Sequence, residues 1–279
     1  MQVSPLVPGA RGIEDIADRT LDRAVILAPA GTIERRYLLA QVLRALKPGG
    51  ELTALAPKDK GGMRLRGELQ GFGCVVGESS RRHHRIARCA APETPTGLGE
   101  AIQAGAPQIA PRIGLWSQPG VFSWDRLDPG TALLLETLPA MEGRGADLGC
   151  GVGVLARAAL ESPRVTGFLL IDIDARAVAA ARRNITDPRA VFEHADVRDP
   201  SPAGLDFVVM NPPFHDAGHE DRALGQAFIA SAAARLKPGG VCRLVANVAL
   251  PYEAVLAACF FRVTLVTQAR GYKVHEARK

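Results

Sequence analysis

The stretch Ala146-Asp147-Leu148-Gly149-Cys150-Gly151-Val152-Gly153-Val154-Leu155 joins an apolar strand pattern to a helix pattern. Its glycines stand at alternate positions, which lets the backbone turn sharply and approach a ligand closely. A dinucleotide fingerprint would need its third glycine at Val154, and a P-loop would need a Gly-Lys-Ser or Gly-Lys-Thr triplet that the stretch lacks. The stretch therefore predicts a nucleotide-type sheet whose ligand does not carry a pyrophosphate.

Acidic residues mark the ends of three successive predicted strands. Asp147 lies on the strand before the loop, Asp172 ends the apolar run 168–171, and Asp196 follows the next strand. The Asp147 carboxylate would repel a pyrophosphate but attract the ammonium of a methionine group. Asp172 can accept hydrogen bonds from both ribose hydroxyls, and Asp196 can meet an adenine amine. Together with Gly149, Gly151 and Gly153, these acids predict an S-adenosylmethionine site.

Strand and helix patterns alternate from about residue 113 to the end of the chain. Helices are expected over Ala175–Asn184, behind an N-cap at Asp174, and over Asp221–Leu236. The pattern predicts an α/β fold with a Rossmann-like, seven-stranded sheet covered on both faces. The strands are expected near residues 144–149, 166–172, 190–194, 205–211, 240–247, 261–267 and 271–277.

The segment Asn211-Pro212-Pro213-Phe214 follows the apolar strand 207–210. Because proline cannot continue a central strand, the chain must leave the sheet there, at the edge where ligands bind. The Asn211 side-chain oxygen and the Pro212 carbonyl can accept both N–H bonds of a planar amine, which would turn its lone pair toward a methyl donor. Phe214 can stack on a base that has left its helix. We expect these four residues to be catalytic, with Asn211 also near the cofactor.

The chain resembles the class I methyltransferases that act on planar exocyclic nitrogens, because residues 211–214 match their motif without departure. More narrowly, it resembles the bacterial small-subunit ribosomal RNA methyltransferase C family, which are guanine-N(2) methyltransferases of 16S rRNA. That resemblance is carried by the segments Gly120-Val121-Phe122-Ser123, Leu127-Asp128-x-Gly130-Thr131, Asn211–Asp216, Val245-Ala246-Asn247, Leu250-Pro251-Tyr252 and Tyr272-Lys273-Val274.

The resemblance implies methyl transfer from S-adenosylmethionine to a guanine amine of small-subunit rRNA. The motif alone also allows a guanine of large-subunit rRNA, adenine N6 or a protein glutamine as the acceptor. A dinucleotide-dependent oxidoreductase and an RNA-binding protein without activity are the alternatives from other classes. The residues that precede the glycine loop, Phe122, Ser123 and Asp128, are expected either to close over the ligand or to form a folded-back linker.

A repeat links the two halves of the chain. Leu46-Lys47-Pro48-Gly49-Gly50 recurs as residues 236–240, and weaker matches flank it in the same order. Residues 1–111 are therefore expected to be a shortened, degenerate copy of the catalytic domain at 112–279, with Ala91–Pro111 as linker. This copy has Ala28-Pro29-Ala30 in place of Asn211-Pro212-Pro213 and no glycine loop, so we expect it to be inactive. Its strands are expected at 23–28, 51–56, 72–78 and 84–90, and its helices at 32–46 and 62–70.

Positive charge is concentrated in the N-terminal part of the chain. Residues 1–112 contain 16 lysine and arginine residues against 11 acidic ones, whereas the remainder contains 18 of each. A basic half beside a neutral catalytic half suggests contact with a polyanion. The residues expected to contact RNA phosphates are Arg81, Arg82, Arg85 and Arg88.

The five cysteines have no paired spacing, which argues against a zinc site or a disulfide framework and fits the cytoplasm. We expect no bound metal, because the adjacent His83 and His84 would point to opposite faces of a strand. No apolar run approaches the roughly 20 residues of a membrane span. The partners expected are ribosomal RNA or the small ribosomal subunit, and the chain itself is expected to be a monomer.

Overall fold

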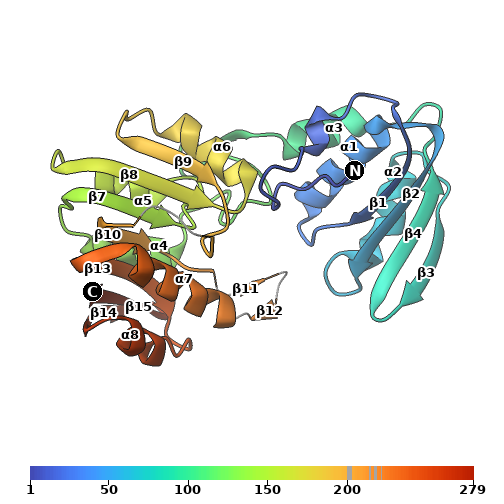
Figure 1. Ribbon diagram of the computed structural model, residues 1–279. Coiled ribbons are helices and arrows are strands. Elements are labelled where there is room, and N and C mark those ends of the chain that lie inside the picture. The colour runs from blue at the N-terminus through green and yellow to red at the C-terminus, as the bar shows by residue number, and fades with distance from the viewer. Residues whose placement is uncertain (200–202, 214, 217–218, 221) are drawn as a thin grey trace. The chain divides into compact units, whose positions relative to one another are not determined.

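The computed structural model describes residues 1–199, 203–213, 215–216, 219–220 and 222–279, and it divides into two compact units (Figure 1). The first comprises Met1–Pro5, Gly9–Gln108 and Gln118–Gly120, and the second comprises Leu6–Pro8, Ile109–Ser117 and Val121–Lys279. Among the described residues, no helix is both long and apolar enough to cross a lipid bilayer.

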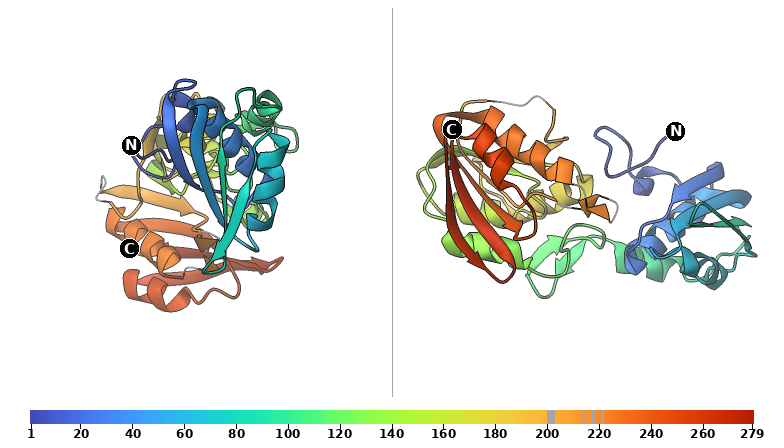
Figure 2. Two further views of the ribbon diagram at one scale, coloured as in Figure 1. Left: turned by 90° about the vertical axis from the view of Figure 1, so that its right-hand side faces the viewer. Right: turned by 90° about the horizontal axis from the view of Figure 1, so that it is seen from below.

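The N-terminal unit is a four-stranded sheet in the order β1-β2-β4-β3, whose strands lie side by side in blue and teal in Figure 2. Strands β1 and β2 are parallel, and β4 runs antiparallel to both β2 and β3. The elements of this unit are η1 (Ile13–Asp15), β1 (Leu21–Leu27), α1 (Thr32–Ala45), β2 (Leu46–Pro57), η2 (Gly62–Arg64), α2 (Leu65–Gly71), β3 (Gly77–Arg81), β4 (His84–Ala90) and α3 (Leu98–Gly105).

Only one face of this sheet carries a core. Leu52, Ala54 and Ala87 point to the helices and are buried, as strand alternation requires. On the opposite face, the side chains of Val25 and Leu27 are 66% and 69% exposed. The N-terminal sheet is therefore packed on one side only.

Two expectations for this unit are wrong. The expected linker at 91–111 contains the helix α3, whose Ala101 is buried in the core. The small residues serve close packing: a Cβ added to Gly105 would lie 2.3 Å from the Tyr37 side chain. The strand expected at 72–78 begins only at Gly77, because residues 72–76 form the turn that follows α2.

The second unit contains the predicted seven-stranded sheet, in the order β14-β15-β13-β10-β7-β8-β9 with β15 antiparallel to its neighbours. The predicted strands and both predicted helices are confirmed to within a few residues. The elements are α4 (Pro129–Thr137), β7 (Gly143–Leu148), α5 (Val154–Leu160), β8 (Val165–Asp172), α6 (Ala175–Asn184), β9 (Ala190–His194), β10 (Leu205–Met210), α7 (Arg222–Arg235), β13 (Leu236–Asn247), α8 (Glu253–Cys259), β14 (Arg262–Ala269) and β15 (Tyr272–Arg278). Short pairs are β5 (Gln108–Ala110) with β6 (Leu115–Ser117), and β11 (His215–Asp216) with β12 (His219–Glu220).

Helices cover this sheet on both faces. Helices α7 and α8 pack on one face and α4, α5 and α6 on the other, so neighbouring residues of β10 such as Phe207 and Val208 are buried in different clusters. A strand buried on both faces needs a continuous apolar run, which the sequence of β10 provides. Since β7, β8, β9, β10 and β13 are parallel, their carboxyl ends meet at one edge of the sheet.

The sequence repeat corresponds to the same glycine-containing turn in both units. Gly49 and Gly239 have positive φ angles of 78° and 81°. Each lies after the first paired residue of its strand, β2 or β13, where the register with the parallel neighbour strand shifts. A Cβ added to the next glycine, Gly50 or Gly240, would lie 2.9 Å from the carbonyl oxygen of the lysine three residues earlier, in both copies. Both sites therefore require glycine for the same physical reason.

Candidate active site

The glycine loop turns from β7 into α5 through three residues with positive φ. The angles are 74° at Gly149, 52° at Gly151 and 88° at Gly153. A Cβ on Gly153 would also lie 2.7 Å from the Ile185 Cδ1 atom, whereas Gly151 faces open space. The loop thus exposes its backbone at the carboxyl edge of the sheet, as the spacing predicts.

Asp147 lies on β7 immediately before this loop and is fully buried. Neither of its carboxylate oxygens has a hydrogen-bond partner among the residues that the structure describes. Burial, and then the nearby charge of Asp172, raise the pKa of Asp147 to about 8. A buried carboxylate without a donor is costly unless a ligand supplies one. Asp147 is therefore suited to a cationic ligand group.

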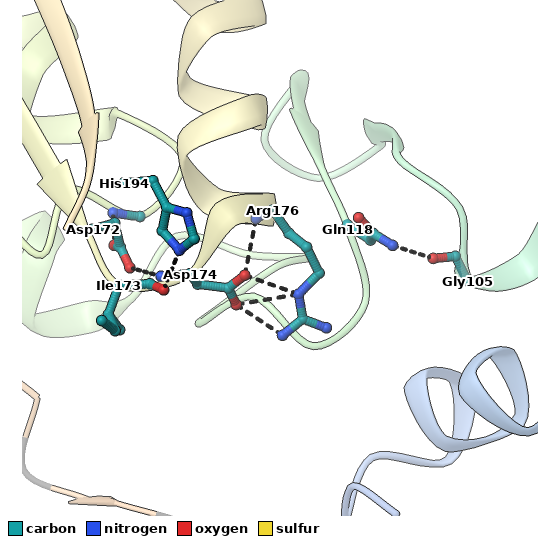
Figure 3. Close-up of polar contacts among 8 residues, drawn as sticks. Gly105, Gln118, Asp172, Ile173, Asp174, Arg176 and His194 are labelled. Atoms are coloured by element: carbon teal, nitrogen blue, oxygen red, sulfur yellow. Dashed lines mark hydrogen bonds and ion pairs between the residues drawn. The ribbon is translucent and has the colours of Figure 1, made fainter. Parts of the chain in front are cut away.

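Asp172 ends β8 and holds two backbone segments together (Figure 3). One carboxylate oxygen accepts from the Gly151 amide at 2.8 Å, and the other accepts from the Asp174 amide at 2.9 Å. Burial raises the pKa of Asp172, although these amides favour its charged form. Each oxygen keeps a second lone pair for a ligand hydroxyl. The contact to the loop is an additional role that the sequence analysis does not predict.

The other two acids of this edge have partners of their own. Asp174 caps α6 as predicted, accepting from the Arg176 amide at 2.9 Å and also pairing with the Arg176 guanidinium (Figure 3). Asp196 accepts from the Arg198 amide and side chain, and this pairing lowers the pKa of Asp196. A ligand amine at Asp196 would therefore share the carboxylate with Arg198.

Asn211 follows β10, and its side-chain amide has a defined orientation. The Nδ2 atom donates to Asp128 Oδ2 and to Thr131 Oγ1, both at 2.9 Å. Since a carboxylate only accepts hydrogen bonds, the amide nitrogen must be the atom that faces Asp128. The Oδ1 atom of Asn211 is left for another donor.

Asp128 is itself fixed by its place at the start of α4. It is the N-cap residue and accepts from the Thr131 amide at 2.8 Å, with Pro129 in the first helical position. Next to it, Gly130 leaves room for the Tyr272 ring, since a Cβ there would lie 2.8 Å from the ring. The motif at 127–131 thus orients Asn211 instead of forming only a linker.

A cavity of about 60 Å³ lies between these groups. It is lined by Phe122 and Ser123, by Asp128 and Thr131 of the α4 start, by the glycine loop and by Asn211. The cavity brings together the predicted cofactor loop and the predicted reaction motif. Of the other three motif residues, Pro212 is buried and Pro213 is half-buried. Phe214 lies outside the described residues.

The four arginines expected to contact RNA do not share one face of the β3–β4 hairpin. Arg85 donates to the Met63 sulfur at 3.3 Å on the helix-covered face, and Arg88 donates to Ser79 Oγ at 3.2 Å on the open face. Arg81 ends β3, and Arg82 has a positive φ of 46° in the turn to β4. The structure therefore places Arg81 and Arg82 at the hairpin turn and Arg85 and Arg88 on opposite faces of β4, instead of all four on a single surface.

Comparisons with known proteins show which family the chain resembles. Residues 112–276 match the family described as Methyltransferase small domain. The "Ribosomal RNA small subunit methyltransferase C" of Pseudomonas paraeruginosa is 34% identical over 92% of this chain and 79% of that protein, and the one of Shewanella loihica is 32% identical over 94% and 78%. A solved 16S rRNA N2 guanine methyltransferase from T. thermophilus, in complex with AdoMet and guanosine, is 29% identical and has a TM-score of 0.81 over 96% of this chain and 76% of that one.

Proposed function

Because this chain belongs to the ribosomal RNA small subunit methyltransferase C family, we propose that it transfers a methyl group from S-adenosylmethionine to the exocyclic amine of a guanine in 16S rRNA. The T. thermophilus relative was solved with AdoMet and guanosine, which are the donor and the acceptor nucleoside of this reaction. The chain is thus an S-adenosylmethionine-dependent rRNA methyltransferase with a Rossmann-like fold.

The residues at the carboxyl edge fit the cofactor. S-adenosylmethionine supplies a methyl group activated by a positively charged sulfur. The buried Asp147 offers its ammonium a carboxylate that has no other described partner. Gly149, Gly151 and Gly153 let the backbone approach it, and Asp172 retains lone pairs for the ribose hydroxyls. We assign Asp196, beside Arg198, to the adenine amine.

Asn211 is the residue we assign to the reacting amine. The Asn211 Oδ1 atom and the Pro212 carbonyl oxygen each accept one N–H bond of the guanine amine. Holding both bonds favours a pyramidal nitrogen, whose lone pair is no longer delocalised into the ring and is directed toward the methyl group. The two oxygens also stabilise the positive charge that develops on the nitrogen. No strong general base is required, because the methylated, cationic amine is acidic enough to lose its proton to water.

The orientation of the Asn211 amide is the observation that carries this assignment. Asp128 and Thr131 accept both hydrogens of its nitrogen, so that only an acceptor atom is left toward the substrate. Such a site selects a hydrogen-bond donor, and an aromatic amine is one. Pro213 fixes the backbone within the motif, and Phe214 is assigned to stacking on the flipped base.

Methyl transfer from labelled S-adenosylmethionine to purified rRNA tests the proposed function. We expect label in 16S rRNA or small subunits and not in 23S rRNA, and mass spectrometry should identify the product as N2-methylguanosine. Label on adenine N6, on a guanine of 23S rRNA or on a protein glutamine would contradict the acceptor and favour one of the other planar nitrogens.

The domain assignment is also a proposal. Residues 112–279 carry the reaction, and residues 1–111 dock the RNA through their excess of positive charge, including Arg81, Arg82, Arg85 and Arg88. The chain acts in the cytoplasm, as a monomer and without membrane attachment. Sedimentation at micromolar concentration would reveal a dimer if the monomer assignment is wrong.

A further inference from the structure

The N-terminal unit contains a cavity of about 280 Å³ outside the site described above. It lies where β1 and β2 end, between Ala30 after the first strand and Lys58 after the second, and η2 closes it. Strands β1 and β2 correspond to β10 and β13 of the catalytic sheet, because both pairs are parallel and share the glycine-dependent break in register. The cavity therefore occupies the edge of the degenerate sheet that corresponds to the catalytic edge.

Arg35 lines this cavity and contacts the carbonyl oxygens of its edge. Its side chain is 1% exposed, and it donates to both carboxylate oxygens of Glu68 at 2.8 and 2.7 Å. It also donates to the carbonyl oxygens of Pro29 and Ala30, at 3.1 and 2.7 Å. The carbonyls of the segment that corresponds to Asn211–Pro213 thus already have a cationic donor.

The loop beneath the cavity is built around this guanidinium. Gly61 has a φ of 93°, and a Cβ added there would lie 2.2 Å from Arg35 Nη1. A buried arginine with a bidentate carboxylate and two carbonyl acceptors is held in one orientation. The cavity therefore has a preformed floor.

The rim of the cavity is basic. Lys58, Lys60 and Arg64 line it, and Asp59 is the one acid among the lining residues. Lys58 and Arg64 are exposed. Arg64 donates to the hydroxyl of Thr32 at 2.8 Å, and because that hydroxyl is neutral, the contact does not compensate the charge of Arg64. The rim extends to the hairpin, because the Lys58 amide donates to the His83 carbonyl at 2.9 Å and Arg85 contacts Met63 of the cavity wall.

We infer that this cavity binds a phosphate group of the substrate RNA, at the edge where the other copy binds its methyl acceptor. The inference rests on the proposed function for the choice of RNA as the source of the phosphate. Three cations and one carboxylate around a concave surface attract an anion, and positive side chains that contact the phosphate backbone position RNA without reading its sequence. The degenerate copy has thus exchanged an amine site for an anion site.

The double variant Lys58→Ala/Arg64→Ala tests the inference, with Arg23→Ala/Lys47→Ala as the matched control. The control removes two exposed cations from the opposite end of the same two strands. Affinity for a 16S rRNA fragment is measured over a range of salt concentrations, without S-adenosylmethionine. The rim variant should bind RNA several-fold more weakly, and its log–log salt slope should fall by about 0.7–0.9 per lost phosphate contact. The RNA affinity and the salt slope of the control variant should change much less. Both double variants should have the melting temperature of the wild type.

Two results would overturn the inference. Equal losses in both double variants would mean that only the overall charge matters. Inorganic phosphate that raises the melting temperature of the wild type but not of the rim variant, together with unchanged RNA affinity, would assign the cavity to a small anion. RNA affinity is measured apart from methyl transfer, so the two proposals can fail separately. If the protein does not methylate guanine but the rim variant still binds RNA more weakly than the control variant, only the proposed function is contradicted.

Discussion

The strands β1-β2-β4-β3 of the N-terminal unit and β10-β13-β15-β14 of the catalytic unit have the same order and directions. The second strand of each quartet contains the same glycine turn. In both, the glycine amide donates at 2.8 Å to the carbonyl of the residue just after the antiparallel neighbour strand, from Gly49 to Ala91 after β4 and from Gly239 to Lys279 after β15. The scaffold alone therefore does not decide which quartet reacts.

The difference lies in what surrounds the equivalent edge. The catalytic quartet is extended by β7, β8 and β9, which bring the glycine loop and the buried Asp147, and its Asn211 lines the cavity and donates its amide to Asp128. The N-terminal quartet stops at β1, and Arg35 occupies the carbonyls of its corresponding segment. In our two proposals, one sheet edge thus accepts hydrogen bonds from a ligand, while the other offers positive charge to a ligand.

Asn211→Ala has the largest expected effect on activity, because it removes the side chain that most distinguishes the catalytic edge from the N-terminal one. Methyl transfer should fall by roughly 100-fold or more, as when one oriented polar group of an active site is lost. The affinity for S-adenosylmethionine should be nearly unchanged, because the glycine loop and Asp172 remain. Single-turnover rates and calorimetry measure the two quantities, and full turnover on the native RNA would mean that the motif is only structural.

Asp172→Ala should have the opposite profile. Losing a charged acceptor for the ribose costs about 1.5–3 kcal/mol, or roughly 10- to 150-fold in affinity for S-adenosylmethionine. The loop amide of Gly151 also loses its acceptor, so thermal melting is recorded alongside. Asp22→Ala, an exposed acid of the N-terminal quartet, serves as control. Unchanged affinity in calorimetry would remove Asp172 from the ribose site.

The pH dependence of cofactor binding tests the role of Asp147. Its pKa of about 8 means that the cofactor-free protein holds it protonated at lower pH, whereas an ammonium ligand needs it charged. Affinity for S-adenosylmethionine should therefore rise with pH between about 6 and 7.5, by at most tenfold per pH unit. Asp147→Asn should bind more weakly and lose most of this slope. A wild-type affinity that is flat over this range would contradict the ammonium assignment.

Thr131→Val has the smallest expected effect and sharpens the mechanism of Asn211. It removes one of the two acceptors that orient the Asn211 amide, which costs about 1 kcal/mol or roughly fivefold in the transfer rate. Thr131→Ser should restore the rate, because it keeps the hydroxyl. If valine and serine reduce the rate equally, packing at this position matters and the hydrogen bond does not.

Local patterns predict the catalytic fold well, and long-range contacts explain what they miss. Helix Ala175–Asn184 is correct because Asp174 caps it and its apolar residues keep the helical period. The small residues of α3 suggest a linker, because composition does not distinguish a flexible segment from a helix that packs closely on Tyr37. The sequence predicts that Asn211 matters but not that Asp128, 83 positions earlier, orients it. The capping pattern at 128–131 is the signal that marks that segment as structured.

The central claim is that the edge carrying Asn211 methylates a guanine amine of 16S rRNA. Mapping methylated nucleotides in rRNA from cells with the protein, without it, and with Asn211→Ala tests it most directly. We expect that an N2-methylguanosine of 16S rRNA disappears when the protein is absent, returns with the wild type, and does not return with Asn211→Ala at equal protein level. A 16S rRNA methylation pattern identical in all three strains would contradict it.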